Sequence, residues 1–209
     1  MKQGYTHISI VLDRSGSMAS CADDTKGGFD TFIEEQKKAP GTATLTLAQF
    51  DDAYEVVHNG IDLKAVPPLD FIPRGMTALL DAIGKTIAST GEFLKAKDES
   101  ERPEHVVFVI LTDGRENASR EYRREKIMEM IKHQESAYKW QFVFLGANQD
   151  AIAAGRDIGI SMDMAMTYDA NRPRAAYASV SKNLHTVRAG ASTRMSFSVE
   201  DRKRNTPKA

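Results

Sequence analysis

The sequence predicts one doubly wound α/β domain, in which a mostly parallel central sheet with one antiparallel edge strand carries helices on both faces. Short apolar runs of strand length alternate with longer segments of helical periodicity, as in sheets built from right-handed crossovers. Some runs, such as residues 106–111, are apolar almost throughout, as strands buried on both faces are. A hydrophobic share of 41% in 209 residues is sufficient for a substantial core.

Six segments have the composition of strands, with β-branched residues and polar or glycine-containing ends. They are residues 7–13, 42–51, 54–63, 106–114, 140–148 and 161–169. Residues 42–51 alternate between apolar and polar with a period of two. Residues 54–63 follow them after a short turn, which predicts the antiparallel edge strand. The last segment alternates methionine with other residues, which indicates a strand with one face toward the core.

Four segments have the periodicity of helices, with apolar residues at intervals of three and four. They are residues 77–94, 119–138, 149–159 and 172–187. The first carries an apolar stripe made of Leu79, Leu80, Ile83, Ile87 and Leu94. The second carries a stripe made of Tyr122, Ile127, Met130, Ile131 and Tyr138. We expect a charged loop at residues 95–104 and a frayed tail at residues 200–209.

The charge balance and the cysteine count narrow the classes of function. Lys and Arg number 28 against 29 Asp and Glu, a formal net charge of −1, which gives no reason to expect a nucleic-acid or membrane partner. Cys21 is the only cysteine, so an intramolecular disulfide and a cysteine-built zinc site are excluded. The first apolar run is too short for a secretory signal, and no segment reaches the length of a membrane span, so we expect a cytoplasmic protein.

In the segment SIVLDRSGSM, Asp13 is the last residue of the first predicted strand, and Ser15 and Ser17 follow in the turn after it. Their three side-chain oxygens suit a hard cation. On its own, the pattern is equally typical of a turn that caps the following helix. Thr77, just before a predicted helix, and Asp113, at the end of a predicted central strand, favour a metal site. Sheets of this class bind ligands beyond the carboxyl ends of their strands.

Together these five side chains form a candidate Mg²⁺ site. The hydroxyls of Ser15, Ser17 and Thr77 are expected to bind the cation, with Asp13 and Asp113 acting directly or through water. Neutral hydroxyls leave a cation open to one further oxygen, while the carboxylates supply the charge that retains it. This arrangement suits the capture of an acidic partner, and no general base for hydrolysis is evident in the sequence.

The same residues carry a resemblance to the von Willebrand factor A (VWA) family. Its metal-ion-dependent adhesion site (MIDAS) combines a D-x-S-x-S segment, a threonine in a G-x-T-x-L context and an aspartate in a T-D-G turn. Residues 13–17, 75–79 and 112–114 match these segments in order and spacing. The resemblance spans residues 4–160 and is strongest to small stand-alone bacterial and bacteriophage members, including those of tellurite-resistance gene clusters.

The resemblance implies a Rossmann-like fold with a complete MIDAS, in which Ser15, Ser17 and Thr77 bind Mg²⁺ or Mn²⁺. It implies that Asp13 and Asp113 bind largely through water, and that an Asp or Glu carboxylate of a partner protein fills the last position. The implied function is protein binding without catalysis.

We expect a single domain over residues 1–190 and a partly disordered C-terminal extension at residues 191–209. The resemblance does not explain residues 161–209.

Two other functions stay open. A Mg²⁺-dependent phosphoryl-transfer enzyme would use Asp13, although enzymes of this kind carry a second acid where Ser15 stands. A scaffold protein would keep the fold and bind through another surface. A phosphate-binding loop around Lys85 is not favoured, because that motif needs a glycine where Leu79 stands.

Overall fold

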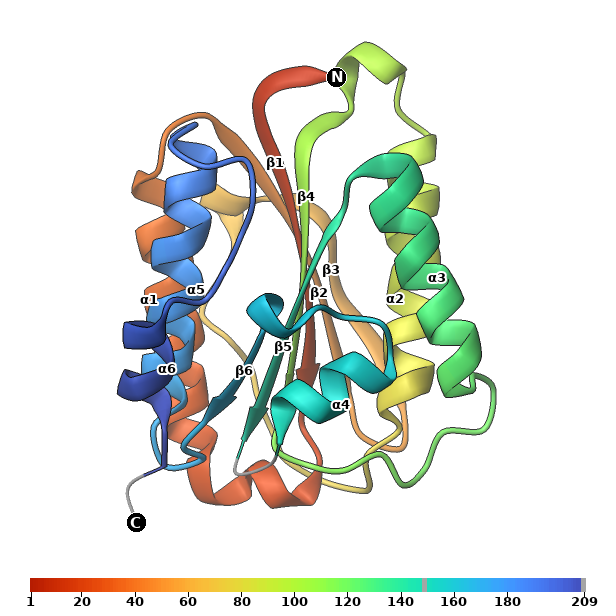
Figure 1. Ribbon diagram of the computed structural model, residues 1–209, viewed down its shortest axis with the longest axis vertical. Helices are drawn as coiled ribbons and strands as arrows, with labels where there is room; N and C mark the ends of the chain where they lie inside the picture. The colour runs from red at the N-terminus through yellow and green to blue at the C-terminus, as the bar shows by residue number, and fades with distance from the viewer. Residues whose placement is uncertain (148–149, 208–209) are drawn as a thin grey trace.

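The central sheet has six strands in the order β3-β2-β1-β4-β5-β6, with helices on both faces (Figure 1). The computed structural model describes residues 1–147 and 150–207. The strands are β1 (Lys2–Asp13), β2 (Thr42–Phe50), β3 (Tyr54–Asp62), β4 (Pro103–Thr112), β5 (Gln141–Ala147) and β6 (Ala165–Tyr168). The α-helices are α1 (Ala22–Lys38), α2 (Leu79–Lys95), α3 (Arg124–Tyr138), α4 (Ala151–Asp157), α5 (Pro173–Arg188) and α6 (Val199–Asn205). The 3-10 helices are η1 (Gly16–Cys21), η2 (Leu63–Ala65), η3 (Glu99–Glu101) and η4 (Met162–Met164).

Strand β1 lies inside the sheet and pairs in parallel with both β2 and β4. Strands β5 and β6 extend the parallel part beyond β4, whereas β3 pairs antiparallel with β2 at the edge. The predicted fold class, including its antiparallel edge strand, is therefore confirmed. The chain passes from β1 to β2 on one side and later reaches β4 on the other, so the strand order reverses between β1 and β4. In such sheets, ligands bind where this reversal occurs, at the carboxyl ends of the strands.

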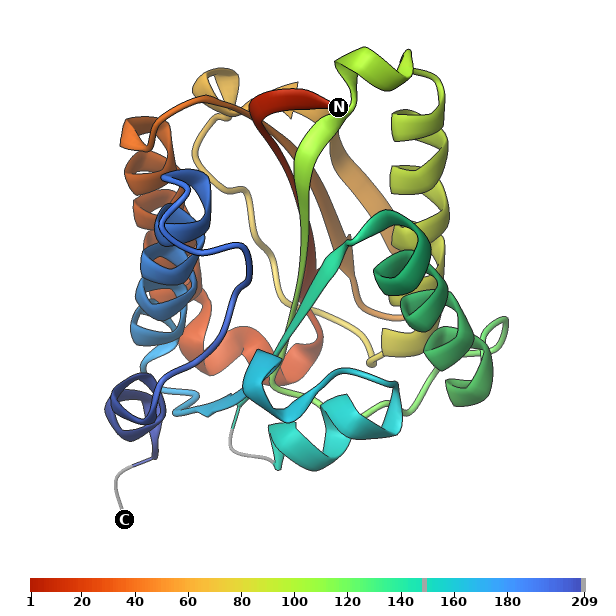
Figure 2. The same ribbon diagram turned by 45° about the horizontal axis from the view of Figure 1, so that its top comes forward.

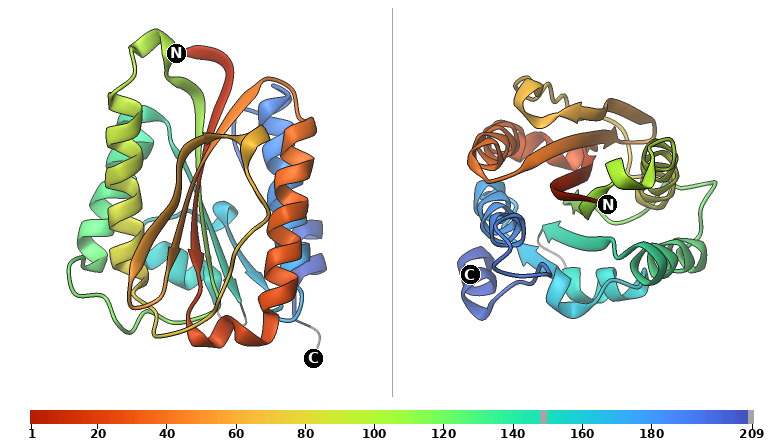
Figure 3. Two further views of the ribbon diagram at one scale, coloured as in Figure 1. Left: turned by 180° about the vertical axis from the view of Figure 1, so that it is seen from behind. Right: turned by 90° about the horizontal axis from the view of Figure 1, so that it is seen from above.

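Helices α1 and α5 cover one face of the sheet, and α2 and α3 cover the other (Figure 1, Figure 3). The strands between these layers are deeply buried, and in β4 every residue from Val106 to Thr112 is buried. The rings of Phe108 and Phe142 pack together across β4 and β5 with their centroids 5.1 Å apart. This confirms that the near-continuous apolar runs are strands buried on both faces. No helix among residues 1–147 and 150–207 is long and apolar enough to span a bilayer.

The four predicted helices are all present, as α2 to α5. The whole predicted stripe of α2 is buried: Leu79, Leu80, Ile83, Ile87 and Leu94. In α3, Ile127 and Ile131 are buried, but Tyr138 is 56% exposed, so its predicted place on the apolar stripe is wrong. Tyr138 is the last helical residue, and its ring packs against the ring of His133 on the same helix.

The predicted last strand is shorter than expected, because its first residues form η4 and β6 begins at Ala165. The predicted ranges 140–148 and 149–159 include residues 148 and 149, which lie outside the described residues.

Helix α1 occupies a segment for which the sequence predictions include no element. Two adjacent glycines, Gly27 and Gly28, lie in its middle, and each disfavours a helix by about 1 kcal/mol relative to alanine. Packing explains why the helix forms. A Cβ atom added to Gly28 would lie 2.7 Å from Tyr177 Cδ2 and 3.2 Å from Arg174 Cα of α5. The missing side chain therefore lets α1 and α5 approach closely, and α1 buries Phe29, Phe32 and Ile33.

Gly28→Ala is expected to destabilise the protein by about 1–3 kcal/mol, because the added methyl group overpacks the contact between α1 and α5. Gly91→Ala is the matched control, since Gly91 lies within α2 and an added Cβ would meet no other described part of the chain within 4 Å. There the better helix propensity of alanine should stabilise the protein, by up to about 1 kcal/mol. Urea unfolding measures the free energy of unfolding of each variant and of the wild-type protein. Equal stabilisation by both substitutions would contradict the tight helix contact.

The C-terminal residues pack against the domain, so the predicted frayed and partly disordered end is wrong for α6. A reciprocal cap starts this helix: Ser198 Oγ accepts the Asp201 N–H at 3.1 Å, and the Asp201 carboxylate accepts the Ser198 N–H at 3.0 Å. Arg202 donates to the Ala165 carbonyl at 2.7 Å, which joins α6 to β6. Figure 2 shows α6 lying beside α5. Residues 208–209 lie outside the described residues, and the boundary near residue 190 stays a prediction.

Candidate metal-binding site

The segment from Asp13 to Ser17 turns sharply at the carboxyl end of β1. Asp13 is fully buried, and its Oδ1 accepts the Ser15 N–H at 2.7 Å. The hydroxyls of Ser15 and Ser17 lie 3.1 Å apart. Helix η1 then carries the chain away and ends at Cys21, a buried residue whose thiol donates to the Met18 carbonyl.

The end of β4 lies against this turn. Thr112 Oγ1 donates to Asp13 Oδ2 at 2.5 Å, and Ser17 Oγ donates to Asp113 Oδ1 at 2.6 Å. Both oxygens of the Asp13 carboxylate therefore accept hydrogen bonds, one from its own turn and one from β4. These contacts bring four of the five predicted ligands together at the point where the strand order reverses.

Thr77 lies at the end of the loop that leads into α2. Its N–H donates to Asn117 Oδ1 at 2.9 Å, and its carbonyl accepts the Asn117 N–H at 3.1 Å. A Cβ atom added to Gly114 would lie 2.7 Å from Thr77 Oγ1 and 3.5 Å from Asp13 Oδ2. The threonine hydroxyl and the Asp13 carboxylate thus border the same small space, and all five predicted side chains converge.

The electrostatics of the two carboxylates favour a cation between them. The pKa of Asp13 lies above its usual value, chiefly because the side chain is buried. Hydrogen bonds from Thr112 and Ser15 lower this pKa, whereas the nearby charge of Asp113 raises it. Burial likewise raises the pKa of Asp113, against the hydrogen bond from Ser17. Among the described residues, no Lys, Arg or His forms an ion pair with either carboxylate. A bound cation would relieve this uncompensated charge.

The donor set fits Mg²⁺ or Mn²⁺. It offers three hydroxyl oxygens and two carboxylates, which are oxygen ligands of the kind that hard cations take. The described residues contain no cluster of three or more His, Cys, Asp or Glu side chains able to hold a metal. A metal bound here would therefore depend on the hydroxyls as well as on the acids.

Several residues that shape the site were not predicted. Glu116 accepts the N–H of Leu80 at 2.9 Å and the N–H of Ser119 at 2.8 Å, so it joins the first turn of α2 to the loop after β4. Asn117 hydrogen-bonds to both the N–H and the carbonyl of Thr77. Buried Asp51 pairs with Arg14 and Arg74. Polar residues in loops have no sequence periodicity, so no signal distinguishes these from solvent-exposed residues.

No protein-family model and no curated protein matches the chain. Similar solved structures were found. Proximal thread matrix protein 1 from the mussel byssus superposes with a TM-score of 0.61 at 15% identity, over 90% of this chain and 47% of that one. A second structure of that protein has a zinc-occupied MIDAS motif, with a TM-score of 0.57 at 18% identity over 90% of this chain and 46% of that one.

Two bacterial structures share the same architecture. A von Willebrand factor type A protein from Catenulispora acidiphila gives a TM-score of 0.56 at 14% identity, over 90% of this chain and 43% of that one. The vWF domain of the type V pili tip protein Mfa5 from Porphyromonas gingivalis gives 0.60 at 8% identity, over 86% of this chain and 94% of that domain. The chain spans about half the length of the mussel protein. The sheet order, the layers and these superpositions together show that the chain has the α/β fold of von Willebrand factor A domains.

Proposed function

We propose that this protein is a Mg²⁺-dependent binding module that captures an acidic side chain of a partner protein. The observation that carries the proposal is the convergence of Asp13, Ser15, Ser17, Thr77 and Asp113 at the carboxyl ends of β1 and β4. These are the residues that would hold the cation, with Mn²⁺ as an alternative to Mg²⁺.

The chemistry of the ligands suits capture. When bound, Mg²⁺ would supply a Lewis-acidic position for one more oxygen. Ser15, Ser17 and Thr77 are neutral, so they cancel none of the positive charge on the cation. Asp13 and Asp113 are held by hydrogen bonds from Thr112, Ser15 and Ser17, which restrain both carboxylates. A carboxylate from Asp or Glu of the partner is the ligand that best complements such a centre.

The known structures support a binding role. The mussel protein is a thread matrix protein with a metal-occupied MIDAS, and the Porphyromonas protein is a pilus tip protein. Phosphoryl transfer through Asp13 is less well supported, because that carboxylate is fully buried and both of its oxygens accept hydrogen bonds. We therefore propose that the protein is not an enzyme. A cytoplasmic location stays a prediction from the sequence.

The test is capture of partner proteins on immobilised protein in Mg²⁺ and in EDTA. We expect at least one partner to be retained in Mg²⁺ and released by EDTA. In that partner, changing one Asp or Glu to its amide should abolish binding, because an amide carries no charge to pair with the cation. A partner retained equally in both buffers, or after every acid-to-amide change, would contradict metal-bridged capture and favour a scaffold that binds through another surface.

A further inference from the structure

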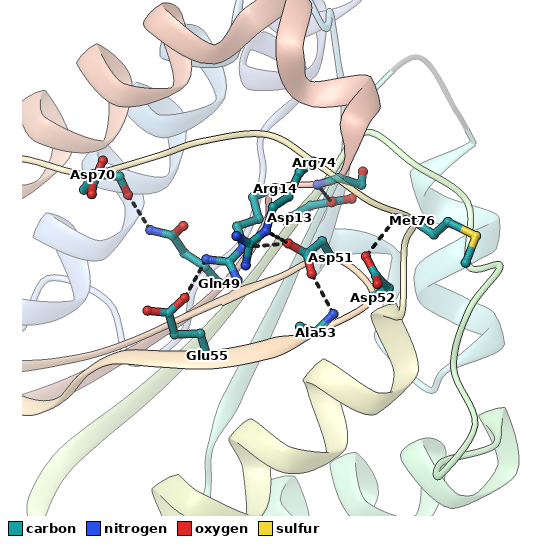
Figure 4. A network of polar contacts seen from close by, with 11 residues as sticks. Asp13, Arg14, Gln49, Asp51, Asp52, Ala53, Glu55, Asp70, Arg74 and Met76 are labelled. Carbon is teal, nitrogen blue, oxygen red and sulfur yellow. Dashed lines mark hydrogen bonds and ion pairs between the residues drawn. The ribbon is translucent and has the colours of Figure 1, made fainter.

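Asp51 lies at the centre of an ionic network beside the candidate site, in which Asp51 and Arg14 are buried and Arg74 and Glu55 are largely exposed (Figure 4). It follows β2 directly and is only 1% exposed. Its Oδ2 accepts from Arg14 Nε at 3.0 Å and from Arg74 Nε at 2.8 Å, and its Oδ1 accepts the Ala53 N–H at 2.6 Å. Arg14 also reaches Glu55 at 2.7 Å, so two arginines and two acids neutralise one another.

The two arginines come from the two loops that carry the candidate hydroxyl ligands. Arg14 lies between Asp13 and Ser15, and Arg74 lies three residues before Thr77. The Arg74 N–H also donates to the Arg14 carbonyl at 2.7 Å, so the loops are joined through both backbone and side chains. Among the described residues, Asp51 is the one carboxylate that pairs with both guanidinium groups.

The loop that carries Thr77 needs such support. Residues 66–78 contain neither helix nor strand, so regular hydrogen bonding does not fix their conformation. Gly75 has φ +69°, and an added Cβ would collide with Asp52 Oδ1, so the turn before Thr77 is closely defined. A hydroxyl carries no net charge to draw it toward a cation. A site built on hydroxyls therefore depends more on the protein to hold its ligands in place than a site built on carboxylates does.

We propose that Asp51 is a positioning residue, which acts through Arg14 and Arg74 to hold the Ser15 and Ser17 turn and the Thr77 loop at the separation that a cation requires. This inference rests on the proposed metal site. In this inference Asp51 is not itself a ligand; it sets the geometry of residues that would be.

Arg74 provides the sharper test, because substitution of buried Asp51 would leave Arg14 buried with one partner fewer and endanger folding. The Arg74 side chain is 61% exposed, so its variants should fold. Loss of a positive charge beside a cation site strengthens cation binding if only electrostatics act. If Arg74 positions Thr77, Arg74→Met weakens binding instead. Arg74→Lys keeps the charge but loses the Nε donor, and it should weaken binding as well.

Arg115→Met is the matched control. Arg115 is exposed, lies two residues after Asp113, and has no hydrogen bond or ion pair within the described part of the chain. Each protein is titrated with Mg²⁺ by isothermal calorimetry, and its metal-free melting temperature is measured alongside. We expect both Arg74 variants to raise the Kd by roughly 10-fold or more, as loss of outer-shell partners does. Arg115→Met should leave the Kd unchanged or lower it.

A purely structural role for Arg74 would lower the metal-free melting temperature without changing the Kd, and that result would overturn the inference. Tighter Mg²⁺ binding by Arg74→Met would also overturn it. Mg²⁺ binding that is absent from the wild-type protein would overturn the proposed function, and this inference with it. If the wild-type protein binds Mg²⁺ and the Arg74 variants bind it with the same Kd, the positioning role is refuted and the proposed function is not.

Discussion

Asp13→Asn is expected to abolish the rise in melting temperature that Mg²⁺ causes in the wild-type protein. A ligand at about 100 times its Kd stabilises the native state by about 2.7 kcal/mol, or roughly 5–10 °C for a domain of this size. Asparagine has the shape of aspartate, and its amide can keep contacts with the Ser15 N–H and with Thr112 Oγ1. It lacks the charge that retains the cation, so the Mg²⁺ response should vanish while the fold persists.

The metal-free Asp13→Asn protein is expected to melt no lower than the wild type at pH 7. Burial raises the pKa of Asp13 in the folded state, so ionisation of this group lowers the free energy of unfolding at neutral pH. That cost shrinks as the pH falls through the raised pKa and is gone below the ordinary pKa of the unfolded chain. Asparagine does not ionise, so this cost is absent from the variant. Asp98→Asn, in the exposed loop before β4, is the control for loss of one charge and should keep the full Mg²⁺ response. An undiminished response in Asp13→Asn would show that the metal binds elsewhere.

Thr77→Ala is expected to raise the Kd for Mg²⁺ by at least about 10-fold. In other metal sites, loss of a residue that only hydrogen-bonds to a ligand already lowers metal affinity or activity by about 10–100-fold. Thr77 is 3% exposed, and its backbone is held by Asn117, so the loop should keep its path without the hydroxyl. The loss of stability should be small, about 1 kcal/mol. Calorimetric titration measures the Kd, and circular dichroism and urea unfolding measure the fold.

Thr77→Ser and Lys85→Ala are the controls for this result. Serine restores the oxygen and should restore most of the affinity. Lys85 lies within α2, and its ammonium group pairs with Glu121 at 2.6 Å, so its removal should leave Mg²⁺ binding unchanged. If Lys85→Ala abolished binding while Thr77→Ala did not, the metal site would have to be abandoned in favour of a nucleotide site.

The strands and the convergence of the site could be predicted because both depend on local signals. Strand β4 contains a continuous apolar run and β2 alternates with a period of two, and Asp13 and Asp113 stand at the carboxyl ends of β1 and β4. Parallel strands bring such carboxyl ends together, so the sequence order of the motifs already indicates one site. Their role as metal ligands stays a prediction until metal binding is measured.

Features that depend on long-range packing could not be predicted. Helix α1 contains two glycines that disfavour a helix, and only the contact with α5 explains their place. The charged segment at the C-terminus looks solvent-exposed in sequence, yet Asp201 caps α6 and is buried. Asp51 likewise has no distinguishing neighbour in sequence, because its partners Arg14 and Arg74 lie far along the chain.

The buried position of Cys21 has a practical consequence for chemical labelling. It is 4% exposed, and burial raises the pKa of its thiol, so the reactive thiolate is both scarce and shielded at neutral pH. Met76, next to Thr77, is 53% exposed. A cysteine introduced by Met76→Cys would then be the single thiol open to a maleimide dye in the folded protein. Fluorescence from that dye would report the arrival of a partner at the rim of the site, with the native cysteine left in place.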